Sequence, residues 1–173
     1  MIELLVAAML FSVIMVSSAL LLSVGLKEWS VEQNRINLRQ ESMPAMETMV
    51  RYIGMAGNYP LLTGGITSAT ATSMTFYADP DNNGVLETVT ISYASNKVTC
   101  TIVGTGTTTV TLAPYVTSFS FAYYNSAGAL LAVPVTPQSS LDSIRIVTIT
   151  MTMTSGNDSI TFNSSAYCRN NHT

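Results

Sequence analysis

The sequence predicts an α+β protein in which one long N-terminal α-helix packs on a C-terminal antiparallel β-sheet domain. Residues 2 to about 56 keep a helical pattern without a turn signal strong enough to end it. From about residue 60 the chain is rich in Thr, Ser, Gly and Val, a composition typical of β-strands. The length of 173 residues fits one domain with an appended element.

The first half of the expected helix, residues 1–26, is apolar on all sides, because no charged residue occurs from Leu4 to Leu26. A run of this length is a candidate for a membrane-spanning helix. It is too long for the apolar core of a cleaved signal peptide, and no Ala-x-Ala site follows it. A plain membrane anchor explains the length but leaves Glu3, at the outer end of the run, unexplained.

The second half, residues 27–57, is predicted to be amphipathic and to lie on a folded domain. Its apolar residues recur at spacings of three and four, at Met43, Met46, Met49, Val50 and Ile53. Pro44 lacks a backbone N–H and is expected to bend the helix. Gly54 and Gly57 are the expected terminators.

The remaining residues, 58–173, are predicted to form the β-rich domain. The expected strands are 73–78, 88–93, 97–103, 107–112, 116–124, 143–154 and 159–166. In the strand 143–154 one side carries Arg145, Val147, Ile149, Met151 and Met153, and the other carries Ile144, Ile146, Thr148, Thr150 and Thr152. Because both sides contain apolar residues, we expect the helix to cover one face and a neighbouring molecule the other.

The stretch IELLVAAMLFSVI resembles the N-terminus of type IV pilins and type II secretion pseudopilins, whose pattern Ile2, Glu3, Leu4 and Leu5 match. Further along, VRYIGMAGNYP, SMTFYADPDNNGVLETVTISY, VTSFSFAYYNSAG and SIRIVTITMTM resemble segments of W-type minor pilins and J-type minor pseudopilins. The resemblance covers most of the chain, and it implies a type IV pilin-like fold.

The resemblance also implies that Glu3, with Ile2, Leu4 and Leu5 around it, is an assembly residue. In that family the glutamate is held to neutralise the N-terminal amine of a neighbouring subunit entering the fibre. A lone carboxylate in an apolar bundle is costly, whereas a paired one is tolerated. The alternative is an acid that reaches the surface of the bilayer. The sequence departs from the family at Met1, where Leu is usual: either the true start lies upstream or processing differs.

The implied function is that of a structural subunit of an extracellular filament, a homopolymer formed through the N-terminal helix from an inner-membrane pool. It is either the major subunit or a low-copy component that primes a pilus or a periplasmic secretion pseudopilus. The implied partners are other pilins or pseudopilins, assembly-platform proteins and a prepilin peptidase, with methylation of the new N-terminus. The competing class is a membrane-anchored extracytoplasmic binding domain that does not polymerise.

Composition argues against two other classes of protein. Charged residues make up 10% of the chain, the net charge is −3, and the seven basic residues are scattered, which is unlike a nucleic-acid-binding surface. The single histidine, His172, lies close to the end of the sequence, and Gly104 and Gly106 are not followed by the lysine of a phosphate-binding loop. We therefore expect no enzymatic activity.

The two cysteines, Cys100 and Cys168, match no metal-binding spacing. In an extracytoplasmic protein the natural interpretation is one disulfide bond that ties the end of the chain to a strand in its middle. The alternative is a pair of buried free thiols.

One loop carries residues that could bind calcium. Oxygen ligands occur at positions one, three, five, seven and nine of a loop with Gly84 at position six, namely Asp79, Asp81, Asn83, the carbonyl of Val85, and Glu87. This matches the first half of an EF-hand loop, but Thr90 stands where a bidentate Glu is required. The segment is either a Ca²⁺ site or a polar turn, for which Asn-Gly is itself a signal. No other cofactor is expected.

Overall fold

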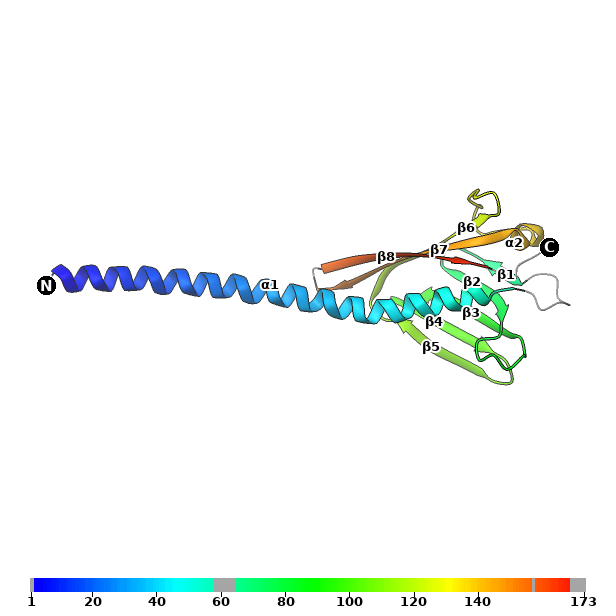
Figure 1. Cartoon of the computed structure of the whole chain (residues 1–173), viewed down its shortest axis with the longest axis horizontal. Coiled ribbons are helices and arrows are strands. Elements are labelled where there is room, and N and C mark those ends of the chain that lie inside the picture. Colours follow the sequence, from blue (N-terminus) through cyan, green and yellow to red (C-terminus); the bar gives the residue numbers. More distant parts are fainter. Residues whose placement is uncertain (1, 58–64, 157, 169–173) are drawn as a thin grey trace.

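A computed structural model describes residues 2–57, 65–156 and 158–168; Met1 and His172 lie outside these ranges. Helix α1 (Ile2–Met55) is 54 residues long, and its first half projects from the β-domain while its second half lies along it (Figure 1). All the strands that follow are paired antiparallel. The α+β class is therefore confirmed, and the architecture is pilin-like.

The strands form two sheets in which neighbours in sequence are neighbours in space. The five-stranded sheet contains β1 (Ile66–Ala69), β2 (Ser73–Ala78), β3 (Glu87–Ala94), β4 (Lys97–Val103) and β5 (Thr107–Ala113). The three-stranded sheet contains β6 (Val116–Asn125), β7 (Ile144–Ser155) and β8 (Asp158–Tyr167). A short helix, α2 (Gln138–Asp142), precedes β7. The seven predicted strands are all present, whereas β1 and α2 were not predicted.

The second half of α1 packs on the β-domain through one stripe of buried residues. This stripe follows the helical repeat and consists of Leu38, Ser42, Ala45, Met46, Met49 and Ile53. The prediction for Met43 was wrong, because this side chain lies beside the stripe and is 68% exposed. The helix continues through Pro44 and ends at Met55. Gly57 then adopts a φ of 142° and donates its N–H to the carbonyl of Tyr77 at 3.2 Å.

Strand β7 shows the alternation that the sequence predicts. Val147, Ile149, Met151 and Met153 are fully buried, and the threonines between them are only partly buried. Ile144, placed by the sequence on the other side, is also fully buried. The cause is a shift of register, since Ile144 pairs with Asn125 whereas Ile146 pairs with Tyr124. Such a bulge turns the residues beyond it to the opposite face.

Aromatic residues of β6 join the two sheets. The rings of Phe119 and Phe121 meet edge to face with centroids 4.8 Å apart. The hydroxyl of the fully buried Tyr123 donates to the carbonyl of Thr70 at 2.8 Å, and that of Tyr93 donates to the carbonyl of Val116 at 3.2 Å. The two sheets and the second half of α1 therefore share one core, and the first half of α1 is left outside it.

Candidate assembly surface

The N-terminal half of α1 has no cover within the described chain, and its most apolar 18-residue window is 0% buried. The exposed apolar side chains are Ile2, Leu4, Leu5, Val6, Met9, Leu10, Phe11, Val13, Ile14, Met15, Val16, Leu20, Leu21, Leu22, Val24 and Leu26. Full burial of one such side chain is worth about 1.5–3 kcal/mol. By length and composition the segment could cross a membrane, and it could equally pack against copies of itself.

The serines of this segment bond to their own helix. Ser12, Ser18 and Ser23 donate to the carbonyls of Met9, Ile14 and Leu20, each at 2.8 Å. Ser17 bonds in the same way to the carbonyl of Val13. These hydroxyls can therefore enter lipid or a dry helix bundle without losing a partner.

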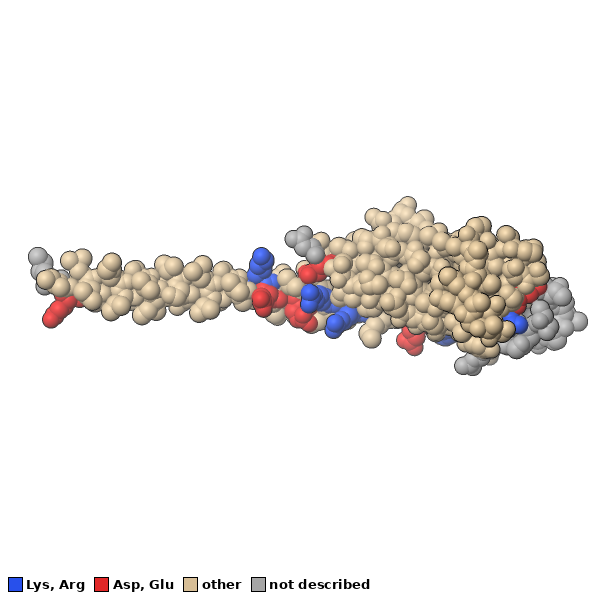
Figure 2. Space-filling model, turned by 90° about the horizontal axis from the view of Figure 1, so that it is seen from above, with Lys and Arg blue, Asp and Glu red and all other residues tan. Residues whose placement is uncertain are grey.

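Glu3 differs from the serines because its carboxylate has no hydrogen-bond or ion-pair partner among the residues that the structure describes. It lies in the first turn of α1, where the helix dipole favours a negative charge. Ile2, Leu4 and Leu5, the other predicted assembly residues, surround it and are 71–77% exposed. In Figure 2 the acid is followed by a long uncharged surface. This arrangement can accept a cation brought by another molecule.

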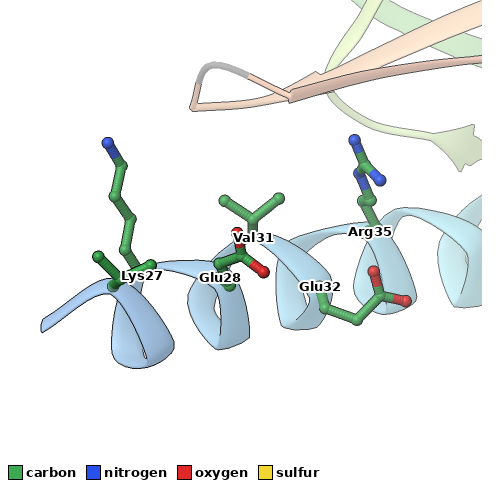
Figure 3. Close-up of a pocket in the computed structure, with 6 residues that line it drawn as sticks. Lys27, Glu28, Val31, Glu32 and Arg35 are labelled. Atoms are coloured by element: carbon green, nitrogen blue, oxygen red, sulfur yellow. The ribbon is translucent and has the colours of Figure 1, made fainter. Parts of the chain in front are cut away.

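Charged residues gather where α1 leaves the apolar segment and reaches the β-domain (Figure 2). An open cleft of about 550 Å³ lies there, lined by Val24, Lys27, Glu28, Val31, Glu32 and Arg35. Figure 3 shows Lys27 and Arg35 pointing toward the side of the overlying strands. Nε of Arg35 lies 3.9 Å from Oδ1 of Asp158, and with Arg35 half exposed this pair is weak. Sequence reasoning missed this belt of charges.

Three of the predicted calcium ligands, Asp79, Asp81 and Asn83, lie together in the loop and form hydrogen bonds within it. Oδ1 of Asp79 accepts the N–H of Asn83 at 3.0 Å, and Oδ2 accepts that of Gly84 at 2.8 Å. Asp81 accepts the side-chain amide of Asn83 at 2.9 Å, and Oδ1 of Asn83 accepts the N–H of Val85 at 2.7 Å. In a polar turn of this kind, the side-chain oxygens accept hydrogen bonds from N–H groups of the same turn.

The remaining acidic ligand points elsewhere. Glu87 begins β3, and its carboxylate lies against Gly104 in the turn between β4 and β5. No group of three or more His, Cys, Asp or Glu side chains that could hold a metal ion occurs in the described ranges. Desolvation raises the pKa of the Asp79 carboxyl, but the backbone bonds from Gly84 and Asn83 outweigh it and hold that pKa below its ordinary value. Ca²⁺ binding stays a prediction.

Cys100 and Cys168 are both free and buried in the structure, and no disulfide bond joins them there. Cys100 lies inside β4, paired in register with Ile91 and Val110. Cys168 follows β8 and donates its N–H to the carbonyl of Arg145 at 2.8 Å. Each position is set by the hydrogen bonds of its own sheet, and the alternative of two buried thiols describes the structure.

Burial raises the pKa of the Cys100 thiol to about 11. Burial also raises the pKa of the Cys168 thiol to about 12, although the positive charge of Arg145 lowers it in part. At neutral pH both thiols should therefore alkylate about a hundredfold more slowly than a free cysteine, or slower still. We expect mass spectrometry to find no modification of the native chain and two modifications after unfolding without reductant. A chain that stays unmodified after unfolding would instead contain the disulfide.

Comparison of the chain with protein-family models and with curated proteins finds no match. The functional assignment therefore depends on the N-terminal motif, on the exposed half of α1 and on the way its other half is packed.

Proposed function

We propose that this chain is a structural subunit of an extracellular type IV pilus-like filament, and a member of the type IV pilin and type II secretion pseudopilin superfamily. The observation that carries the proposal is the contrast within one helix. The second half of α1 packs one face on the β-domain, while the first half exposes apolar side chains all round and begins with an acid that has no partner among the described residues.

The exposed half explains how such a fibre is held together. In the membrane, lipid covers these side chains; in the fibre, the helices of other copies cover them, so the chain exchanges one apolar environment for another. The serines need no outside partner in either state. The β-domain then lies on the outside of the fibre and is connected to the helix core through the buried contacts at residues 38–53.

Glu3 gives the proposal its specificity. A carboxylate at the start of an apolar helix is costly in any assembly that leaves it unpaired. In the proposed fibre it pairs with the N-terminal amine of an adjacent copy, and this pairing selects one relative position of the two chains. The proposed partners are further copies of the chain, other pilins or pseudopilins, assembly-platform proteins and a prepilin peptidase. No catalytic role is proposed.

The proposal is tested by shearing cells that produce the full chain and examining the detached material by electron microscopy and mass spectrometry. We expect fibres that contain this chain and that separate from the cells without detergent. Recovery only as monomers in detergent extracts would establish the anchored binding domain instead. The abundance of the chain relative to other fibre proteins decides between a major subunit and a low-copy priming component.

A further inference from the structure

Four charged residues follow one another along one face of α1, just beyond its apolar half. Glu28 and Glu32 form an acidic band, and Arg35 and Arg39 form a basic band. Their spacing of four, three and four residues places all four positions on one face of the helix, although in Figure 3 the side chains of Arg35 and Glu32 point to different sides. Within each band the two like charges are four residues apart, which weakens an isolated helix.

The charges of these bands are largely unpaired within the chain. The only ion pair recorded among the described residues joins Arg35 to Asp158 at 3.9 Å, although the positions of Glu32 and Arg35 also suit a helical pair. All four side chains are exposed. Figure 2 shows the negative and positive groups following each other along the helix. An acidic band followed by a basic band is complementary to a partner surface on which positive charges face the first band and negative charges face the second.

We propose that the two bands set the axial stagger between adjacent copies of this chain, the acidic band of one copy facing the basic band of the next. This inference rests on the proposed function, because it requires parallel helices side by side. Arg35 lies seven residues after Glu28, and Arg39 lies seven residues after Glu32. Seven residues correspond to about 10 Å along the helix axis. Without stagger, like bands of two parallel copies face each other; with a stagger of about 10 Å, opposite bands do.

This stagger is compatible with packing of the apolar segments. Residues 4–26 extend over roughly 34 Å, so a shift of about 10 Å keeps about two thirds of the run in contact. The bands lie directly beyond that run, where neighbouring helices exclude part of the water and strengthen ionic attraction. Apolar contacts alone do not fix the register of the copies. In the proposed fibre the Glu3 pair positions the outer ends of the helices, and the bands hold the same register at the other end of the apolar segment.

The test uses the full chain with each band reversed. The variant E28K/E32K carries four positive charges at the four band positions, and R35E/R39E carries four negative charges there. Each variant alone therefore repels its own copies at every stagger. We expect each to lower the yield of sheared fibres at least about tenfold. When the two variants are produced in the same cells, their stripes are complementary, and we expect fibres containing both to return.

A control matched to E28K/E32K is E41K/E47K, which makes the same change of net charge at two exposed positions of α1 outside the two charged bands. It should leave the yield of fibres unchanged, and thermal unfolding should show that the β-domain stays folded in every variant. Normal fibres from either reversed variant alone, or failure of the two to assemble together, would overturn the inference and leave the proposed function standing. Absence of fibres from the unmodified chain would overturn both.

Discussion

Replacing Glu3 by Ala should keep the chain out of fibres while leaving the β-domain folded. The side chain lies at the outer end of α1, far along the helix from the buried stripe that begins at Leu38, so its removal changes nothing in the core. In the proposed fibre, however, removal of the carboxylate would deprive a buried amine of its counter-charge. Removing one partner of a buried ion pair costs roughly 3–5 kcal/mol, enough to reduce incorporation by a hundredfold or more.

The measurement is the amount of chain in the sheared fraction relative to the membrane fraction. Glu3→Gln should behave like Glu3→Ala, because it keeps the shape and removes the charge, whereas Glu3→Asp keeps the charge and should retain part of the assembly. Thermal unfolding of all variants should match the unmodified chain. Normal fibres from Glu3→Gln would favour the alternative in which the acid lies at the surface of the bilayer and has no role in assembly.

Much of the fold could be predicted because its signals are local. Every predicted strand appears with ends within one residue of those observed, since period-two alternation and polar turns define hairpins and each strand here pairs with its neighbour in sequence. The elements that were missed are the four-residue β1 and the five-residue α2. Both are too short to show a period. Strand β1 pairs with β2, the next strand in sequence, whereas α2 contacts β1, which is remote from it in sequence.

The sites show where local pattern ceases to be sufficient. The EF-hand-like spacing places Glu87 in the calcium loop, yet strand β3 begins at that residue and carries its carboxylate toward Gly104. Cys100 and Cys168 are distant in sequence, and only the structure shows that each is a buried free thiol. The two charged bands can be seen in the sequence as like charges four residues apart, but only the structure shows that they are largely unpaired.

The largest effect on stability is expected at Met49, in the middle of the contact between α1 and the sheets. Its side chain is fully buried, so Met49→Ala should lower the free energy of unfolding of the β-domain by about 2–5 kcal/mol through lost contacts and a cavity. Unfolding by urea can be followed through the near-ultraviolet circular dichroism of the buried Tyr123. Mild detergent micelles should be present throughout, because they cover the apolar half of the helix.

Met43 provides the matched control, since it is the same residue type on the same helix but is 68% exposed. Met43→Ala should change the free energy of unfolding by no more than about 0.5 kcal/mol. Equal losses from both variants would contradict the assignment of Met49 to the buried face, and helix propensity could not explain them because Ala is the strongest helix former. If Met49→Ala alone is destabilising, the second half of α1 is part of the core, and a force on the β-domain is transmitted to the exposed half without a flexible linker.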